Sequence, residues 1–417
     1  MDLCNSITVA SNGISGNKMK KEKRENLRFD SKAVYCPPDE ATKSISPPII
    51  MSSSFQYDSE IFQRIVEGAR KEVNIYGRCG NPTEYQFEEQ MMMIEGADAC
   101  LATASGMAAI SVALLGLLKS GDHIVCDWTT YSSTHEMLDH RLTDYNIETT
   151  FVDMSDKDAV KAAIRPNTKV LYFETIANPS MKVAEISPLV EMAHERGIIV
   201  MCDNTFASPY VMRPLDWGAD IVVESATKFI GGHSDVIGGA ICMKSDILPK
   251  DFLEQIRWNT MVKLGAPIAP FNAWMLSRGI QTLSVRLERA CQSAAKLAQH
   301  FESHVGVNKV WYPGLPSHAQ HEIAKAQMPK FGAMLTFDVG DGDRALKVLD
   351  NLELSCFSAS LGGVRTTTQI PALMAFLDIP EQERLEMGIS NGMIRVSVGL
   401  EDPEDLIADF DAALALL

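Results

Sequence analysis

An acid and a lysine follow two neighbouring segments that the sequence predicts to be buried strands. Asp203 comes directly after the apolar run 198–202, and Lys228 ends the polar turn 224–228 that follows the run 221–223. In a parallel sheet covered by helices, the carboxyl ends of the strands meet at one edge, and ligands bind there. We therefore expect the Asp203 carboxylate and the Lys228 amine to reach the same edge of a sheet.

This pair of side chains suits pyridoxal 5′-phosphate (PLP), a cofactor that needs a lysine amine for its covalent attachment. An anion beside the pyridine nitrogen keeps that nitrogen protonated, so that the ring withdraws electrons from the substrate Cα. The lysine is released during the reaction and can then move protons. Ser225 and Thr227 carry hydroxyls for the phosphate, and a helix beginning at 105–107 offers backbone N–H groups to it. Tyr131 follows another predicted strand and can cover the ring.

Each of these residues also has a simpler explanation. An aspartate after a strand is most often a turn or cap residue, and Ser-Gly before a helix is most often a cap. A lysine in a polar turn is usually solvated, and a pair such as Gly238-Gly239 is typical of a turn or a bulge. Their joint placement at successive strand ends favours the cofactor interpretation.

Alternating β-rich runs and helical stretches predict the scaffold that positions these residues. Strands that alternate with helices indicate βαβ units, and hence a mainly parallel sheet covered on both faces. An α/β fold with a smaller second domain is therefore expected. Strands are predicted at 123–126, 148–152, 169–173, 198–202 and 221–223, and helices at 83–94, 105–119, 132–143, 155–164 and 185–195.

The chain changes character toward both ends. Residues 1–27 are polar and partly basic, which predicts a disordered tail. Residues 28–80 contain two Pro-Pro pairs and little periodicity, which predicts an arm rather than a domain. We assign 81–270 to a PLP-binding α/β domain and 271–417 to a smaller C-terminal α+β domain. In the latter, a long helix is predicted at 270–304, strands at 309–312 and 333–339, and helices at 341–351 and 402–415.

Composition excludes several classes of protein. A net charge of −16 argues against a nucleic-acid partner, since phosphates attract a basic surface. No run of about eighteen apolar residues predicts a membrane span. The nine cysteines are scattered and lack CxxC spacing, so neither a disulfide framework nor a metal site is expected. A reducing cytoplasm is the expected compartment.

Seven segments of the chain resemble, in order, the Cys/Met-metabolism family of PLP enzymes. This family includes cystathionine γ-synthase, the cystathionine γ- and β-lyases, methionine γ-lyase and O-acetylhomoserine sulfhydrylase. The lysine segment Ser225-Ala226-Thr227-Lys228-Phe229-Ile230-Gly231-Gly232-His233-Ser234-Asp235-Val236-Ile237-Gly238-Gly239 is the most specific match. The others are 76–78 with 81–83, 105–107, 174–179, 203–209, 360–363 and 395–402, and matching blocks extend from about residue 45 to the end.

The resemblance implies a fold-type-I, aspartate-aminotransferase-like enzyme with a mainly parallel seven-stranded sheet. It implies that Lys228 carries PLP as a Schiff base and moves protons, and that Asp203 pairs with the pyridine nitrogen. Tyr131 would stack on the ring and assist proton transfer. The phosphate would be held by Gly106, Met107, Ser225 and Thr227.

Further roles implied by the resemblance concern the substrate and the assembly. Arg395 would bind the α-carboxylate of an amino-acid substrate as a bidentate fork. Asn178 and Ser360 would lie beside cofactor and substrate. Tyr76 and Arg78 would reach the phosphate in the neighbouring subunit, with Tyr76 also near the substrate, in a homotetramer built from two tight dimers.

The reaction is expected to be γ-elimination on a sulfur-type amino acid, giving 2-oxobutanoate and ammonia. The segment 172–181 resembles methionine γ-lyases, and Ala359 stands where cystathionine-cleaving lyases carry a glutamate. A small apolar residue there offers no partner to a distal ammonium. The alternatives are γ-replacement on an O-acylhomoserine, as in cystathionine γ-synthase or a homoserine sulfhydrylase, and a catalytically idle binding protein.

Three departures from the family pattern suggest an altered pocket for the γ-substituent. Tyr131-Ser132-Ser133 replaces the Tyr-Gly-Cys of methionine γ-lyases, and Ile370 begins a segment that departs from the family's His-Pro and Met-Thr-His. Arg365 stands where a glutamate is common. It either lines the pocket or is an ordinary surface residue.

Overall fold

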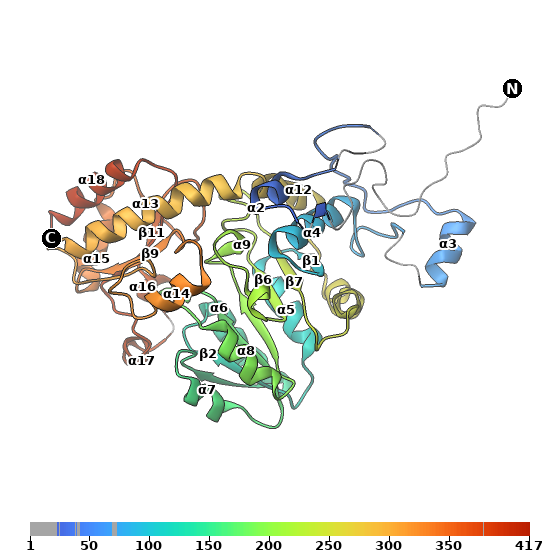
Figure 1. The fold of residues 1–417 in the computed structure, drawn as a ribbon, viewed down its shortest axis with the longest axis horizontal. Helices are drawn as coiled ribbons and strands as arrows, with labels where there is room; N and C mark the ends of the chain where they lie inside the picture. Colours follow the sequence, from blue (N-terminus) through green and yellow to red (C-terminus); the bar gives the residue numbers. More distant parts are fainter. Residues whose placement is uncertain (1–22, 25, 38, 40–41, 69–72, 378) are drawn as a thin grey trace.

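The computed structural model describes residues 23–24, 26–37, 39, 42–68, 73–377 and 379–417. Figure 1 shows two α/β bodies side by side, the C-terminal one at the left and the larger one in the centre, with the N-terminal arm at the right. Most of the tail predicted at 1–27 lies outside the described residues. None of the helices in the described chain has both the length and the apolar character needed to cross a membrane.

A seven-stranded sheet forms the centre of the larger body. Only β7 runs antiparallel to its neighbours, so the predicted mainly parallel sheet is confirmed. In spatial order, the strands are β1 (Ala99–Thr103), β7 (Gly239–Met243), β6 (Ile221–Glu224), β5 (Ile199–Asp203), β4 (Thr168–Glu174), β2 (His123–Asp127) and β3 (Glu148–Val152).

Two hydrophobic cores cover the two faces of this sheet. Because side chains alternate along a strand, Val200 and Cys202 of β5 join the core under helix α4, whereas Ile199 and Met201 join the core under helix α5. The helical segments are α4 (Pro82–Glu95), α5 (Gly106–Leu117), α6 (Ser132–Glu136), η1 (Met137–Arg141), η2 (Thr143–Tyr145), α7 (Lys157–Ala163), α8 (Ile186–His194), α9 (Ser208–Val211), η3 (Pro214–Trp217), α10 (Phe252–Ile256), η4 (Arg257–Met261), α11 (Val262–Leu264) and α12 (Pro270–Ile280). The helix predicted at 132–143 is divided among α6, the π-helix η1 and η2.

The C-terminal body is a five-stranded sheet packed against helices. Its strands, in spatial order, are β10 (Cys356–Phe357), β11 (Thr367–Gln369), β12 (Met393–Ser397), β9 (Met334–Asp338) and β8 (Lys309–Trp311). Its helices are α13 (Leu283–Ser303), α14 (His321–Gln327), α15 (Gly342–Asp350), α16 (Pro371–Met374), α17 (Glu381–Glu386) and α18 (Pro403–Leu414).

The long helix predicted at 270–304 is two helices, so that prediction was wrong in this respect. Helix α12 ends at Ile280 and α13 begins at Leu283. The carbonyl of Gly279 accepts hydrogen bonds from Thr282 N, at 3.2 Å, and from Arg286 Nη2, at 2.7 Å. These bonds satisfy a carbonyl that a continuous helix would use for its next turn.

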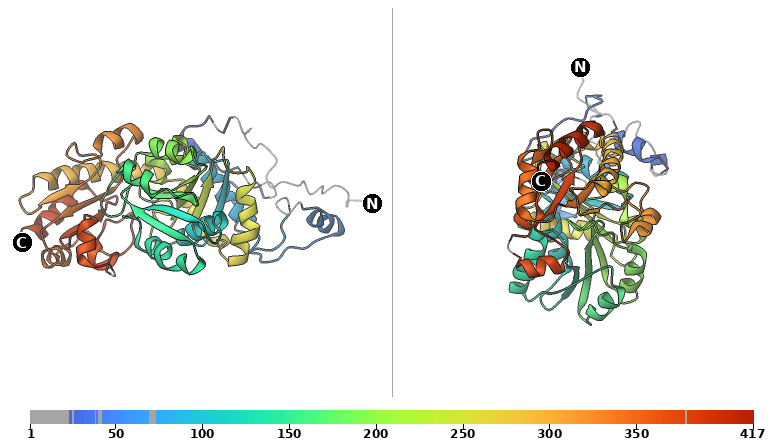
Figure 2. Two further views of the ribbon diagram at one scale, coloured as in Figure 1. Left: turned by 90° about the horizontal axis from the view of Figure 1, so that it is seen from below. Right: turned by 90° about the vertical axis from the view of Figure 1, so that its left-hand side faces the viewer.

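The arm contains two short helices with different surroundings. Helix α2 (Phe29–Val34) packs on α4, and Phe29 meets the Tyr210 ring edge-on at 5.3 Å. Helix α3 (Ser59–Val66) has no buried residue and projects away from the body in Figures 1 and 2.

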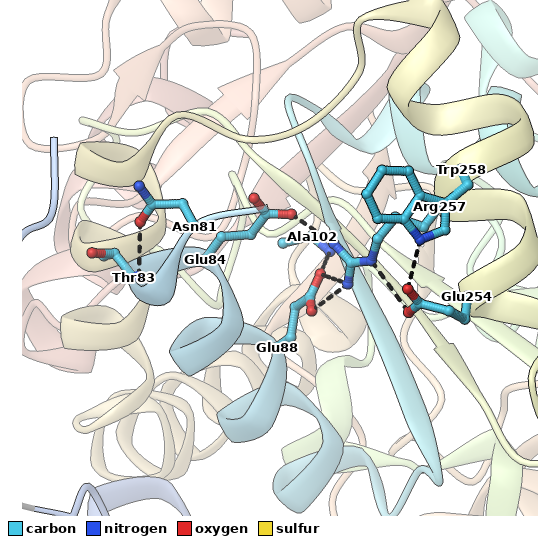
Figure 3. A network of polar contacts seen from close by, with 8 residues as sticks. All are labelled: Asn81, Thr83, Glu84, Glu88, Ala102, Glu254, Arg257 and Trp258. Carbon is cyan, nitrogen blue, oxygen red and sulfur yellow. Dashed lines mark hydrogen bonds and ion pairs between the residues drawn. The ribbon is translucent and has the colours of Figure 1, made fainter. Parts of the chain in front are cut away.

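A buried arginine connects α4 to the edge of the large sheet (Figure 3). Arg257, at the start of η4, is 1% exposed and forms ion pairs with Glu88 at 2.6 Å, Glu84 at 3.1 Å and Glu254 at 3.6 Å. Glu88 also accepts the backbone N–H of Ala102 in edge strand β1, at 2.8 Å. One cation therefore holds together helix α4, strand β1 and the segment that begins with η4.

Candidate active site

A cavity of about 480 Å³ opens at the carboxyl ends of the parallel strands. Its walls come from the ends of β4, β5 and β6, from the start of α5 and from strands, a helix and a loop of the C-terminal body. The structure thus brings together most of the residues that the sequence predicts for the site. Ten of them line this cavity: Gly106, Met107, Tyr131, Asn178, Asp203, Ser225, Thr227, Lys228, Ser360 and Arg395.

Lys228 lies in the loop after β6 and points its amine at the C-terminal body. Its Nζ donates a hydrogen bond to Ser360 Oγ at 2.9 Å. Burial, together with the nearby charge of Arg395, lowers the pKa of Lys228 to about 8, and the charge of Asp203 opposes this shift. A substantial fraction of this amine is therefore neutral near pH 8, as covalent attachment to an aldehyde requires.

The lowered pKa of Lys228 predicts how cofactor-free protein takes up PLP. Since only the neutral amine reacts, the attachment rate should rise with pH, reach half its maximum near about 8 and then level off. The measurement is the rate at which the cofactor absorbance shifts after mixing, taken from about pH 6.5 to about 11.5. A half-maximum near the ordinary lysine value of 10.5 would show that the site does not perturb Lys228.

Asp203 is the last residue of β5 and is 9% exposed. One carboxylate oxygen accepts the N–H of Thr205 at 3.0 Å, and the other accepts the Tyr172 hydroxyl at 3.4 Å. Burial raises the pKa of the Asp203 carboxyl, while these hydrogen bonds and the nearby Lys228 charge oppose the rise. A protonated pyridine nitrogen is a cation that would offset the cost of burying this carboxylate.

The start of α5 forms a cradle for a phosphate. Ser105 caps the helix by accepting the N–H of Ala108 at 3.1 Å, while Gly106 and Met107 occupy the first turn, where N–H groups have no partner within the helix. A Cβ on Gly106 would lie 2.6 Å from Ser225 Cβ, so glycine lets the two segments approach closely.

Thr227 lines the same cavity, but its hydroxyl forms hydrogen bonds with the backbone of Gly238.

Arg395 is a buried cation that the C-terminal body contributes to the cavity. It is 4% exposed and lies on β12; its Nη1 donates to Asn178 Oδ1 at 3.0 Å and its Nη2 donates to the Ser360 carbonyl at 2.8 Å. Among the described residues its buried Nε has no hydrogen-bond partner. Ser360 has the unusual φ of +77°. In this conformation its carbonyl accepts a hydrogen bond from Arg395 and its hydroxyl accepts one from Lys228. The arginine is thus held in a fixed orientation, suited to a carboxylate.

Four predicted positions lie outside this cavity. Tyr76 and Arg78 are exposed; the guanidinium of Arg78 lies 5.8 Å from the Tyr76 ring centre, and its Nη1 donates to the Val262 carbonyl at 2.7 Å. Arg365 is exposed and donates to the Leu354 carbonyl at 3.3 Å, so it is a surface residue here. Ile370 is fully buried in the core of the C-terminal body rather than in the cavity wall.

Several further residues of the cavity wall were not predicted from the sequence. Glu174 ends β4, in register with Asp203, and Thr205 follows β5. The rule that selected Asp203 and Lys228, a polar residue at a strand end, also applies to Glu174. Gln369 and Met374 come from the C-terminal body, where the short strand β11 and helix α16 were not predicted.

These groups together match what PLP needs. The cavity contains a perturbed lysine, a buried carboxylate and a capped helix N-terminus beside Ser225, and a buried arginine faces it from the second body. Gly106 lets the capped helix end approach Ser225 closely, so that both can contact one phosphate group. The fold and the site therefore define a fold-type-I PLP enzyme.

Comparison with known proteins gives the family. The chain belongs to the Cys/Met metabolism PLP-dependent enzymes, whose family model matches residues 32–415. It is 41% identical over 399 residues to an L-methionine gamma-lyase of Porphyromonas gingivalis, covering 95% of this chain and 99% of the relative. It is 40% identical over 376 residues to a cystathionine gamma-lyase of Bacillus subtilis, covering 90% and 96%.

A solved structure shows the same architecture. The cystathionine gamma-lyase from Lactobacillus plantarum, complexed with L-serine, matches with a TM-score of 0.87 at 36% identity, covering 93% of this chain and 99% of that chain. The resemblance inferred from the seven segments, the fold class and PLP as the cofactor are thus confirmed.

Proposed function

We propose that this enzyme is a carbon–sulfur lyase that catalyses γ-elimination on a small thioether amino acid of the methionine type. The relatives named L-methionine gamma-lyase and cystathionine gamma-lyase support γ-elimination. The observation that favours a small uncharged γ-substituent is the composition of the cavity wall. Its only charged side chains among the described residues are Glu174, Asp203, Lys228 and Arg395, and the rest of the wall is uncharged, including Ser133, Ala359 and Met374.

The described side chains can hold such a substrate and move its protons. When bound, PLP withdraws electrons from the substrate Cα and so makes its proton acidic. Arg395 offers its buried Nε edge to the α-carboxylate, and the neutral Nζ of Lys228 accepts the Cα proton. Tyr131, which is 40% exposed at the cavity, covers the ring and assists proton transfer. Loss of a Cβ proton and of the thiol, followed by addition of water, gives 2-oxobutanoate and ammonia.

The assembly and the compartment form part of the same proposal. Tyr76 and Arg78 are exposed outside their own subunit's cavity, which supports a role in the site of a neighbouring subunit within a homotetramer. In this division, 28–80 is the arm, 81–270 the PLP-binding domain and 271–417 the C-terminal domain. The described cysteines form no disulfide, which supports a reducing, cytoplasmic setting.

Product analysis of the PLP-loaded enzyme tests the proposal. Methionine, cystathionine, homocysteine and O-acetyl- or O-succinylhomoserine are each supplied with and without a thiol acceptor. We expect 2-oxobutanoate, ammonia and methanethiol from methionine at a rate that does not depend on added thiol. Cystathionine should react more slowly, because its distal ammonium and carboxylate find no charged partner in the described wall.

Other product patterns would contradict the assignment. Formation of a thioether solely from an O-acylhomoserine plus thiol would establish γ-replacement. Pyruvate rather than 2-oxobutanoate from cystathionine would establish β-elimination. No product from any of these compounds, with cofactor bound, would exclude them as substrates.

A further inference from the structure

Glu174 is the one acidic residue of the cavity wall to which the proposed mechanism gives no task. It is the last residue of β4 and is 7% exposed. In the parallel pairing of β4 with β5 it lies opposite Asp203. Paired residues of neighbouring strands point to the same face of a sheet, so the two carboxylates stand side by side at the cavity. Burial and the Asp203 charge both raise the pKa of Glu174.

Two backbone segments of the site are held by this one side chain. One oxygen of Glu174 accepts the N–H of Tyr131 at 2.6 Å, and the other accepts the N–H of Asn178 at 3.0 Å. Tyr131 is the first residue before helix α6, so the bond fixes where that helix begins. Both bonds have an ionised acceptor when the carboxylate is charged, and such bonds are the stronger kind.

The bond to Asn178 continues to the substrate-binding arginine. The side-chain oxygen of Asn178 accepts Arg395 Nη1 at 3.0 Å, so the position of the Asn178 backbone determines where that oxygen stands. Arg395 is buried, and burial lowers its pKa to about 9, while the charge of Glu174 opposes the shift. Glu174 therefore acts on Arg395 both through a chain of contacts and through its charge.

We propose that Glu174 is a positioning residue for the substrate carboxylate: through Asn178 it holds Arg395 in the orientation that binds an α-carboxylate, and through Tyr131 it holds the residue that covers the cofactor. Its carboxylate oxygens accept the backbone N–H groups of Tyr131 and Asn178, so it acts on the substrate site through these two residues. This inference rests on PLP binding by the family and does not depend on which elimination the enzyme catalyses.

The variant Glu174→Gln tests this proposal by keeping the shape and removing the charge. Its amide NH₂ group faces one of the two backbone N–H donors, so one hydrogen bond is lost. The measured quantity is the affinity for glycine, which has a carboxylate but no γ-substituent. Glycine binding is monitored by the change in the absorbance of bound PLP. Its affinity should fall about 10- to 100-fold, the range for losing a hydrogen bond to a charged group.

Glycinamide separates positioning from general damage to the site. It offers the same amine but no carboxylate, so its weaker binding should change little in the variant. The ratio of glycine to glycinamide affinity should therefore fall by about the same factor as the glycine affinity. Glu148→Gln serves as a matched control, because Glu148 is exposed on β3 and pairs with Arg165. It should leave the ratio unchanged.

Three results would overturn the proposal. An unchanged glycine affinity in Glu174→Gln would show that the carboxylate does not act on Arg395. An equal loss for both ligands would indicate a general disturbance of the site. Failure of the variant to fold or to bind PLP would show that Glu174 is structural rather than positioning. Product analysis is a separate assay, so failure of the γ-elimination proposal would leave these outcomes interpretable.

Discussion

Replacing Lys228 with alanine should abolish turnover and the covalent link to PLP while leaving the fold intact. Lys228 is the one lysine among the described residues that line the cavity. Its Nζ is partly buried with a lowered pKa, so it serves both as the amine for attachment and as the base for the Cα proton. Loss of a positioned general base alone costs roughly 10²- to 10⁴-fold, and loss of attachment adds to it. We expect a loss of at least about 10³-fold in the rate of 2-oxobutanoate formation.

Borohydride trapping followed by mass spectrometry provides a readout independent of turnover. The wild-type chain should retain the added cofactor mass after denaturation, and Lys228→Ala should not. Lys228→Arg keeps the positive charge but cannot supply a neutral amine, so it should behave like the alanine variant. Lys244→Ala is the matched control, because Lys244 is about half exposed and lies near Asp216 on the surface. Retained cofactor mass in Lys228→Ala would assign the attachment to another lysine.

The part of the site that could be predicted from the sequence follows from one rule, which selects polar residues directly after predicted buried strands. It led to Asp203 and Lys228, which line one cavity, because both follow short, continuous apolar runs rich in β-branched residues, which are typical of buried parallel strands. It would equally have selected Glu174, whose strand was predicted to end one residue earlier. The contribution of Arg395 required the resemblance, since no rule of local pattern brings β12 to the ends of β4 and β5.

Two strands of the large sheet were missed for a physical reason. Strand β1 contains two alanines, Ala99 and Ala102, and alanine has a weak strand preference. Strand β7 begins at Gly239, where the glycine pair was interpreted as a turn or bulge. A Cβ on Gly239 would lie 2.3 Å from the Ser105 carbonyl, so this glycine marks the close approach of β7 to the phosphate cradle. Tertiary contact rather than local propensity decides the conformation there.

The buried network around Arg257 cannot be predicted from the sequence pattern, for a related reason. Periodicity identifies apolar faces, whereas Arg257, Glu84 and Glu88 are polar residues with at most 5% exposure. Their burial is tolerable only because the positive charge of the arginine balances the negative charges of the glutamates. The two sides of these ion pairs lie far apart in the chain. A buried charged residue can therefore be predicted only when the residue that pairs with it is already known.

Removing this compensation gives the largest expected effect on stability. In Arg257→Met, the carboxylates of Glu84 and Glu88 remain buried without their cation, and breaking a buried pair in this way costs about 3–5 kcal/mol. Urea-induced unfolding should show a midpoint lowered accordingly. Arg141→Met is the matched control, because the Arg141 side chain is 78% exposed and pairs only with surface Asp144 among the described residues, so its midpoint should not move.

The pH dependence and a compensated variant separate lost charge from lost packing. Without Arg257, burial and the charge of the neighbouring Glu88 keep the pKa of Glu84 above its ordinary value, so the folded state binds more protons than the unfolded state. The loss of unfolding free energy in Arg257→Met should therefore be smallest below about pH 4, where these carboxyls are protonated in both the folded and the unfolded state. The loss should grow as pH rises through the raised folded-state pKa. Adding Glu84→Gln and Glu88→Gln removes the uncompensated charges and should restore much of the stability at neutral pH. A deficit that is independent of pH and is not relieved by the triple variant would mean that Arg257 stabilises this junction by packing alone.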